Sequence, residues 1–425
     1  MKNNHSNART VLIIGAGAAG LMAGIRAAEK DPNRQVLIAE RMERPGRKLL
    51  ITGKGRCNVT NCCTIEEFMP NVLTNPRFLY SSLNALSPYE VMGFFEECGV
   101  PLKVERGERV FPVSDHSSDI VNALVQKAKD SGCRFLYNCR IKELLLEQTD
   151  DGQTVRGALT EDGEKILADA VIVATGGKSY PATGSTGDGY QLARQAGHRV
   201  TPLRPSLIPL VCKEKYCRDM MGLSLKNVTL RVADTQSGKE VFSELGEMLF
   251  THFGVSGPLV LSASCHMQPD KNGSLERYRL YIDWKPALST QQLDARILRD
   301  FEQFINKDFI NSLGQLLPRK AIQPVAKLSG IPFETKINQI TREQRLGLVE
   351  LIKAMPITPV AFRPIEEAIV TAGGVDVAQI NPKTMESKLV SGLYFAGELL
   401  DVDGYTGGFN LQIAFSTGYA AGQAV

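Results

Sequence analysis

The sequence predicts an α/β fold that begins with a βαβ unit and is interrupted by an inserted β-rich domain with a small helical part. Three observations predict it. An unbroken apolar run at residues 11–14 and a segment at 35–39 that is apolar after Gln35 suit strands buried on both faces, and they flank an alanine-rich helical segment. Hairpin and helix-start signals gather in the middle of the chain. Strand–turn patterns return after residue 360 and end in a helix over residues 410–423.

The predicted first domain is discontinuous and comprises residues 1–193 and 356–425. The inserted domain, residues 194–355, is expected to be β-rich over 194–288 and helical over 289–355. The change of character after residue 193 marks the boundary, because prolines punctuate an extended stretch there.

Two kinds of local signal place elements inside the insertion. A Ser237-Gly238 turn between two strand-like segments indicates a β-hairpin. Ser289 with Gln292, and Thr341 with Gln344, have the spacing of capping boxes and predict two helix starts.

Composition excludes several classes of protein. The chain has 425 residues with 43% hydrophobic and 22% charged residues, as in ordinary globular proteins, and a net charge of +3 that predicts no nucleic-acid partner. Nine cysteines without CxxC spacing argue against a disulfide framework, predict no metal site, and indicate a reducing cytoplasm. No apolar stretch approaches the ~20 residues of a membrane span, so no membrane partner is expected.

A glycine turn follows the first predicted strand. Gly15 permits the tight turn, Gly17 permits backbone to approach a pyrophosphate, and Gly20 permits close packing of helix on strand. Glu40 lies 20 residues beyond Gly20, at the end of the second strand, where it would accept hydrogen bonds from a ribose diol. The first domain is therefore predicted to be Rossmann-like and to bind a dinucleotide.

Two later segments favour FAD over NAD. Thr175, Gly176 and Gly177 close a late buried strand, as a second loop near the cofactor would. The C-terminal segment returns with acidic residues and glycines before a helix whose N-terminus would face the flavin pyrimidine edge. Its predicted contacts are Gly397, Glu398, Asp403, Gly408 and Asn410. The pattern is typical of the glutathione-reductase type. The glycine-rich run 184–189 does not follow a strand at the spacing of a second dinucleotide turn.

Residues 41–56 are rich in arginine, lysine and glycine, which suits a clamp for phosphate or for the flavin edge. The sequences of residues 46–61, 179–190 and 250–258 closely resemble motifs of the BaiN/RdsA-like (YhiN-like) family of bacterial NAD(P)/FAD-dependent oxidoreductases. Residues 371–375 and 397–414 resemble further motifs of the same family. The resemblance implies bound FAD and an inserted β-rich domain. Activities within that family include reduction of ring double bonds in oxidised bile acids and oxidation of small amines, so membership does not define the substrate.

The resemblance also implies roles for individual residues. Those carried over to the ADP half of FAD are Gly15, Gly17, Ala18, Ala19, Gly20, Glu40 and Arg41. Those carried over to the pyrophosphate and flavin are Lys48, Gly53, Arg56, Cys57 and Asn58. Those carried over to the ribityl chain and pyrimidine edge are Gly397, Glu398, Asn410, Leu411 and Gln412. The predicted cofactor set is completed by Ala16, Arg47 and Ile141.

Candidates for the chemistry itself are fewer. His252, in a glycine-rich loop of the insertion, is a predicted acid/base or substrate contact, although a structural histidine is equally compatible with the pattern. Tyr180 is a second predicted proton donor. Cys57 and Cys62 have the CxxxxC spacing of flavin disulfide reductases, but no second nucleotide-binding domain or C-terminal His-Glu pair accompanies them.

The sequence thus predicts an FAD-dependent oxidoreductase that transfers hydride between flavin N5 and a small organic substrate, with NAD(P)H as the electron donor, as a monomer or small homo-oligomer. Two alternatives remain open. One is a thiol-disulfide oxidoreductase using Cys57 and Cys62, and the other is a flavoprotein acting on an RNA or protein partner.

Overall fold

The computed structural model describes residues 9–150 and 152–425, which divide into two compact units. Unit 1 runs to Ser206 and resumes at Ala368, and unit 2 is Leu207–Glu367. The sequence places these boundaries at 193/194 and 355/356, about a dozen residues earlier at each end.

Strand pairing explains where the units divide. β11 (Arg204–Ser206) pairs with β19 (Val370–Ala372), so both strands belong to unit 1. β17 (Met355–Ile357) and β18 (Pro359–Phe362) pair with strands of unit 2. These pairings join residues far apart in the sequence, so local patterns do not reveal them.

Unit 1 is organised around a five-stranded parallel sheet in the order β21-β10-β1-β2-β6. The strands are β1 (Thr10–Ile14), β2 (Gln35–Ala39), β6 (Arg134–Leu136), β10 (Ala170–Val173) and β21 (Leu393–Phe395). β1, β2 and β10 are almost completely buried, as expected for strands covered on both faces. The predicted Rossmann-like α/β fold and its first two strands are therefore confirmed.

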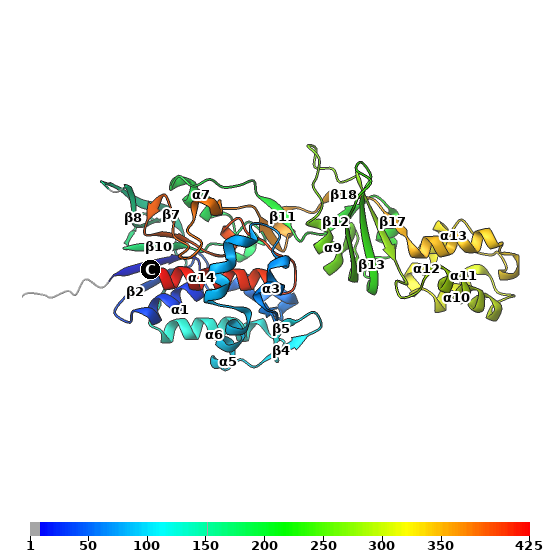
Figure 1. Cartoon of the computed structure of the whole chain (residues 1–425), viewed down its shortest axis with the longest axis horizontal. Helices are drawn as coiled ribbons and strands as arrows, with labels where there is room; N and C mark the ends of the chain where they lie inside the picture. The colour runs from blue at the N-terminus through cyan, green and yellow to red at the C-terminus, as the bar shows by residue number, and fades with distance from the viewer. Residues whose placement is uncertain (1–8, 151) are drawn as a thin grey trace, which may run out of the picture. The chain divides into compact units, whose positions relative to one another are not determined.

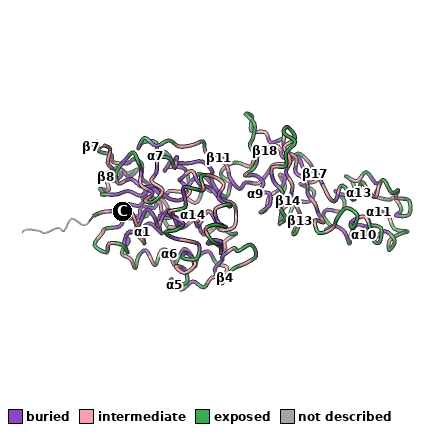
Figure 2. The backbone as a smooth tube through the Cα atoms, in the orientation of Figure 1, coloured by how far each residue is buried: buried purple, intermediate pink, exposed green. Residues whose placement is uncertain are grey.

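Two helices from opposite ends of the chain run side by side in unit 1 (Figure 1). α1 (Ala18–Lys30) and α14 (Phe409–Ala424) approach closely because Gly418 and Gly422 of α14 lie against the backbone carbonyls of Ala19 and Ala23. A side chain at either glycine would overlap α1. Both helices are largely buried (Figure 2), so the C-terminal helix is part of the core of unit 1.

Further elements of unit 1 surround this sheet. The helices are α2 (Arg47–Ile51), α3 (Ile65–Phe68), α4 (Tyr80–Ala85), α5 (Pro88–Glu97), α6 (Ser117–Asp130) and α7 (Asp188–Gln195). The strands are β3 (Thr60–Asn61), β4 (Leu102–Glu105), β5 (Arg109–Pro112), β7 (Ile141–Thr149), β8 (Gly152–Thr160), β9 (Lys165–Leu167) and β20 (Val390–Ser391).

The abundance of glycine, arginine and lysine in residues 41–63 suggests a loop, but the segment contains α2 and β3. α2 is stabilised by tertiary contact, because Leu49 is buried and the Ser117 hydroxyl of α6 donates a hydrogen bond to the Leu50 carbonyl (2.8 Å). A five-residue helix has little stability of its own, so its sequence carries only a weak helical signal.

Unit 2 contains a seven-stranded sheet in the order β17-β16-β13-β14-β15-β12-β18. Besides β17 and β18, its strands are β12 (Leu210–Cys212), β13 (Ser224–Asp234), β14 (Glu240–Phe250), β15 (Gly254–Ser256) and β16 (Tyr278–Asp283). All neighbouring strands are antiparallel. β13 and β14 form the predicted hairpin, with Ser237 and Gly238 in its turn.

The helices of unit 2 are α8 (Lys215–Asp219), α9 (Pro258–Ser264), α10 (Thr290–Gln303), α11 (Phe309–Ser312), α12 (Arg319–Leu328) and α13 (Arg342–Lys353). Both predicted capping boxes are present at the starts of α10 and α13. Ser289 Oγ accepts from Gln292 N (3.2 Å) while Gln292 Oε1 accepts from Ser289 N (2.9 Å), and Thr341 and Gln344 repeat the arrangement.

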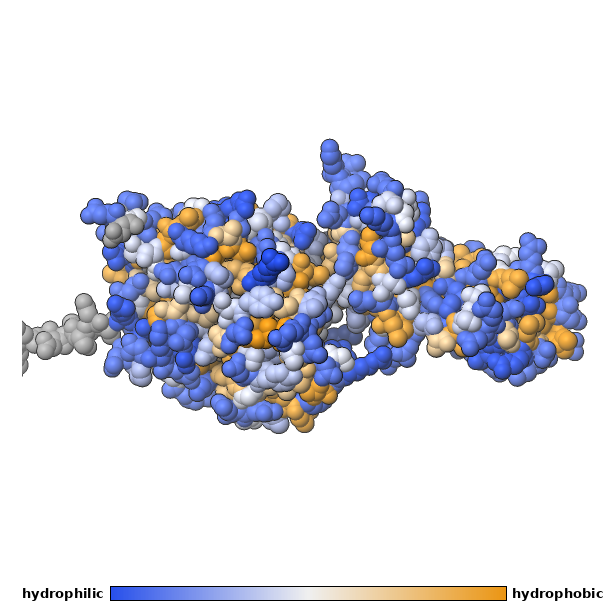
Figure 3. Space-filling view, viewed as in Figure 1, coloured by the Kyte–Doolittle hydropathy of each residue, from blue (hydrophilic) through white to orange (hydrophobic). Residues whose placement is uncertain are grey.

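Two absences apply to residues 9–150 and 152–425. In that part of the chain, every helix is too short or too polar to cross a membrane. The same residues contain no group of three or more histidine, cysteine or acidic side chains arranged to hold a metal ion. The face drawn in Figure 3 is predominantly hydrophilic, with apolar residues in small groups on both units.

Candidate functional site: a crevice at the strand ends of unit 1

Predicted site residues from distant parts of the sequence come together at the carboxyl edge of the parallel sheet. Gly15 follows β1, Glu40 follows β2, Thr175 follows β10 and Gly397 follows β21. In doubly wound α/β folds, ligands bind in the crevice outside this edge. The sequence predicts these residues from separate motifs, and the order of strands in the sheet makes them neighbours.

The dinucleotide turn has the backbone that its glycines suggest. Gly15 has φ 104° and donates its N–H to the Ala39 carbonyl (2.8 Å), which ties the turn to β2. A Cβ at Gly20 would overlap the Gly15 carbonyl oxygen, whereas a Cβ at Gly17 would meet no heavy atom within 4 Å. Gly17 is the N-cap of the 13-residue helix α1. The first-turn N–H groups of α1 therefore lie next to a position where no other side chain or backbone atom is close. Such a helix start suits a pyrophosphate.

Glu40 is held at the mouth of this turn. Its Oε2 accepts from Ala16 N (2.9 Å) and its Oε1 accepts from Met42 N (2.9 Å). Burial raises the pKa of the carboxyl, and these two hydrogen bonds together with Arg41 and Arg47 oppose the rise. The carboxylate oxygens are rigidly placed and keep further acceptor capacity for a ribose diol.

A second polar cluster joins four segments of unit 1. Lys48 Nζ donates to Ser179 Oγ (2.7 Å) and to Glu398 Oε2 (2.5 Å). Glu398 Oε1 accepts from Ser179 Oγ (3.1 Å) and from Thr371 N (2.9 Å). α2, the segment after β10, β19 and the segment after β21 therefore meet at one ion pair. Gly177 lies against it, since a Cβ there would come within 2.9 Å of Glu398 Oε1.

Two buried polar atoms near the strand ends lack a hydrogen-bond partner, but the fit to FAD rests on other residues. Within the described part of the chain, the Thr175 hydroxyl and Asp403 Oδ1 are buried without a hydrogen-bond partner. Asp403 Oδ2 accepts from Ser206 Oγ (2.7 Å). The Thr175 hydroxyl is covered by α7, since a Cβ at Gly189 would come within 2.1 Å of it. The fit to a polar ligand such as FAD therefore rests on the open helix start at Gly17 and on the acceptor capacity of Glu40. Glu40, Lys48 and Glu398 would hold that ligand along the strand ends.

The arginine- and glycine-rich segment is bound partly to unit 1 itself. Arg56 forms ion pairs with Glu105 and Asp115, and its guanidinium lies 4.1 Å from the centroid of the Phe111 ring. Gly53 has φ 57°, and a Cβ there would crowd Asn58 N at 2.9 Å. These contacts shape the loop.

Cys57 and Asn58 lie at the end of this loop. Cys57 is buried at φ 58°, and burial raises the pKa of its thiol to about 12. The Asn58 carboxamide, oriented to satisfy its neighbours, accepts from Gly408 N (2.9 Å) and so links the loop to the start of α14.

The start of α14 is held by amide side chains. Asn410 Oδ1 accepts from Gly404 N (2.9 Å) and its Nδ2 donates to the Gly404 carbonyl (2.7 Å). Gln412 is fully buried, and its amide bonds to Thr60 Oγ1 (2.6 Å) and the Leu86 carbonyl (2.9 Å). Leu411 between them is partly exposed. The hydrogen bonds of Asn410 and Gln412 within unit 1 hold the helix start in place.

Other predicted residues lie around the same edge. Arg47 begins α2, and Gly46 before it donates to the Ala16 carbonyl (2.9 Å), so α2 is tied to the dinucleotide turn. Ile141 is buried at the start of β7. Tyr180 has φ 52° and precedes a 3₁₀ turn at Pro181–Thr183.

His252 lies in unit 2, in the loop between β14 and β15. Its side chain is exposed and its ring packs edge-on against Phe253, with centroids 4.9 Å apart. Its carbonyl accepts from Arg218 Nε (3.2 Å) of α8. The predicted acid/base residue and the predicted cofactor residues thus belong to different units.

Sequence reasoning missed several polar residues of unit 1. Ser179 and Thr371 complete the Lys48–Glu398 cluster. The glycine-rich run 184–189 was set aside because it lacks a preceding strand, yet Gly184 lies against Met42 beyond the end of β2. Its Asp188 binds Arg41 and Arg140. The glycines and acid of that run were the available signal.

The fold and the family match define a class: a flavoprotein oxidoreductase with a Rossmann-type FAD-binding domain. The chain belongs to the family described as HI0933-like protein Rossmann domain, whose sequence profile matches residues 9–424. Members of this class carry out FAD-dependent redox chemistry, and the predicted family is confirmed.

Relatives and solved structures agree with this assignment. The chain is 32% identical over 417 residues to the 3-dehydro-bile acid delta(4,6)-reductase of Clostridium scindens, covering 97% of this chain and 98% of that protein. It is 33% identical over 418 residues to the ribosomal RNA dihydrouridine synthase of Haemophilus influenzae, with the same coverages. The Escherichia coli protein with that name is 29% identical, covering 97% of this chain and 96% of that protein.

Two solved structures share the fold. A 3-ketosteroid-delta4-(5alpha)-dehydrogenase from Rhodococcus jostii has TM-score 0.52 at 16% identity, covering 99% of this chain and 98% of that one. A flavocytochrome c3 fumarate reductase has TM-score 0.51 at 18% identity, covering 99% and 78%.

Proposed function

We propose that the chain is an FAD-dependent reductase that saturates a ring carbon–carbon double bond conjugated to a carbonyl in a small organic substrate, with NAD(P)H as donor. One observation carries the proposal: relatives at 32% and 33% identity are named for different substrates but for the same chemical change. A 3-dehydro-bile acid reductase and a dihydrouridine synthase both add two hydrogens across a ring double bond near a carbonyl.

The reaction needs a hydride for one carbon and a proton for the other. Bound flavin supplies the hydride chemistry at N5. Glu40 and the Lys48–Glu398 pair would hold the cofactor, and His252 or Tyr180 would deliver the proton. Because the sequence contains a single dinucleotide turn, we expect reduced nicotinamide to approach the flavin face that the substrate later occupies.

Anaerobic stopped-flow spectroscopy tests the proposal. The purified yellow protein should bleach with NADH or NADPH, and a cyclic enone should restore the flavin absorbance while becoming saturated. A saturated ketone of the same ring system is the matched control and should leave the flavin reduced. A colourless protein that binds no added FAD, or reduced flavin that no enone reoxidises, contradicts the proposal.

The thiol-disulfide alternative is less compatible with the site. Burial raises the pKa of Cys57 to about 12, so its thiol stays protonated near neutral pH and is a poor nucleophile. The pKa of Cys62 is raised as well, by burial and by Glu108. A Cys62→Ser variant should have the same turnover as the parent protein. Loss of turnover with flavin retained would support the thiol-disulfide mechanism instead.

A second candidate function is the same reduction on a uridine of ribosomal RNA. The two dihydrouridine synthases suggest it, and the charge of unit 2 favours it. The formal excess of +3 falls entirely within unit 2, because basic and acidic residues balance in the rest of the chain. Exposed Arg218 and Lys320 lie on adjoining segments, α8 and α12, with Lys320 Nζ bonded to the Met221 carbonyl (2.8 Å).

Filter binding with deproteinised ribosomal RNA tests this candidate. RNA retained at moderate salt should be lost in an Arg218→Glu/Lys320→Glu variant and kept in the matched Lys239→Glu/Lys271→Glu variant, which reverses exposed charges elsewhere on unit 2. Failure of the parent protein to retain RNA removes the candidate.

A further inference from the structure

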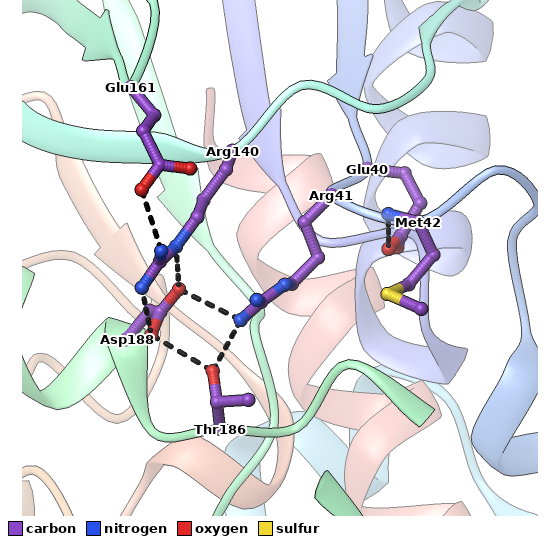
Figure 4. A network of polar contacts seen from close by, with 7 residues as sticks. All are labelled: Glu40, Arg41, Met42, Arg140, Glu161, Thr186 and Asp188. Carbon is purple, nitrogen blue, oxygen red and sulfur yellow. Dashed lines mark hydrogen bonds and ion pairs between the residues drawn. The ribbon is translucent and has the colours of Figure 1, made fainter. Parts of the chain in front are cut away.

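A carboxylate in unit 1 joins two arginines close to the residues that follow β2 (Figure 4). Asp188 Oδ2 accepts from Arg41 Nη1 (3.1 Å) and from Arg140 Nε (2.9 Å). Its Oδ1 accepts from Arg140 Nη2 (3.3 Å) and from Thr186 Oγ1 (2.9 Å), and Thr186 Oγ1 also accepts from Arg41 Nη1 (2.5 Å). Arg41, Arg140, Thr186 and Asp188 are called the Asp188 clasp below.

The clasp is electrostatically well formed. Burial alone would raise the pKa of Asp188, but the hydrogen bonds from Arg140 and Thr186, together with the positive charges of Arg140 and Arg41, outweigh burial and lower the pKa. The Asp188 side chain is 18% exposed, so water screens its ion pairs only partly. Arg140 also pairs with Glu161 (2.8 Å), whose side chain is 57% exposed. The Asp188 carboxylate therefore contributes most to holding Arg140 and Arg41 together, and the exposed Glu161 carboxylate contributes little.

The clasp gathers three chain segments at one place. Arg41 directly follows Glu40, whose carboxylate is bonded to the dinucleotide turn. Cys139 N donates to the Glu40 carbonyl (2.9 Å), so the segment leading to Arg140 continues alongside β2. A Cβ at Gly184 would come within 3.1 Å of Met42 Cγ, so the glycine-rich loop 184–188 lies on the same residues.

We propose that Asp188 is a positioning residue for the adenosine half of FAD. It holds the loop 184–188 and Arg140 against Arg41, and through the backbone at residues 40–42 it keeps the Glu40 carboxylate aimed at the ribose. The inference requires FAD in the crevice but does not depend on which substrate is reduced.

Affinities of the apoprotein for FAD and for ADP test this role without turnover. ADP carries the adenosine and pyrophosphate but no flavin. Asp188→Asn keeps the size of the side chain and removes its charge. It should lower the affinities for FAD and for ADP by the same factor, roughly tenfold, as expected for lost charge-assisted hydrogen bonds. Glu161→Gln is the matched control, because it removes only the exposed partner of Arg140, and should change both affinities by less than about twofold.

Three results would overturn the proposal: weaker FAD binding with unchanged ADP binding, no change in either, or tighter ADP binding because a released arginine captures phosphate. Thermal unfolding of the apoprotein shows whether Asp188→Asn is folded. If it is not, Thr186→Val gives the same comparison, since it deletes only the hydroxyl between Arg41 and Asp188. If the parent protein reduces no enone, but Asp188→Asn weakens FAD and ADP binding equally, the proposed function is rejected and the positioning role of Asp188 is retained.

Discussion

Unit 1 and unit 2 differ in how clearly their residues indicate a function. In unit 1, glycines, acids and cations at strand ends have specific partners, and buried atoms of Thr175 and Asp403 are left without one. In unit 2, the predicted chemical residue is one exposed histidine in a loop. A shared cofactor imposes the same turns and charges on many proteins, whereas substrate surfaces are specific to each. The comparison teaches that unit 1 defines the chemistry and unit 2 is where specificity should be sought.

The largest expected effect lies in the dinucleotide turn. Gly20→Ala should abolish FAD binding and lower the unfolding temperature of the apoprotein, because its Cβ would overlap the Gly15 carbonyl. Gly17→Ala is the control: its Cβ meets no protein atom within 4 Å, so the apoprotein should stay stable while FAD affinity falls, since the methyl would face the pyrophosphate. Calorimetry and flavin titration separate the two. Equal stability losses would show that both glycines serve only packing.

A change in unit 2 should affect chemistry without affecting the cofactor. His252→Gln should lower kcat by about 100-fold, the smaller end of general acid–base effects, with flavin content unchanged. Flavin absorbance per protein and steady-state turnover measure the two quantities. Unchanged kcat would leave His252 a structural residue and move the proton donor to unit 1, where Tyr180 is the next variant to make.

A buried histidine makes the stability of unit 1 depend on pH. His198 Nε2 is 2.7 Å from Ser387 Oγ, and burial lowers its pKa to about 4. The unfolded chain, with a histidine pKa of about 6.5, binds the proton first as pH falls. The contribution of His198 to stability therefore decreases between about pH 6.5 and 4 and is constant above pH 6.5. At pH 5 the loss should be roughly 2 kcal/mol. Denaturant unfolding of His198→Asn should show a flatter profile in this window, and an equally steep one would assign the acid sensitivity to other groups.

The smallest effect is expected at the Lys48–Glu398 pair. Lys48→Met should weaken FAD binding about tenfold, because Glu398 loses its partner while retaining Thr371 N and Ser179 Oγ as donors. Lys54→Met, at an exposed position six residues later, is the control. Retained FAD affinity in Lys48→Met would show that the ion pair is structural and would narrow the cofactor site to the β1–β2 side.

Much of unit 1 followed from local sequence. The turn at Gly15–Gly20, the apolar runs of β1 and β2, and Glu40 after β2 are short-range patterns with a direct physical meaning, and the structure contains them as predicted. The hairpin and both capping boxes of unit 2 are equally local. Each needs only neighbours within a few residues, which is why one sequence sufficed.

Long-range pairing was decided by tertiary structure. Glu398 lies 350 residues from Lys48, and Asp188 lies 147 from Arg41, so no periodicity connects them. The pairing of β11 with β19, which sets the limits of unit 2, is likewise invisible in local patterns. The sequence by itself determined the α/β class, the dinucleotide turn and the family of the protein. Only the folded sheet, by bringing the strand ends to one edge, decided which charged side chains contact one another, because hydrogen bonds and ion pairs depend on distance in space rather than along the chain.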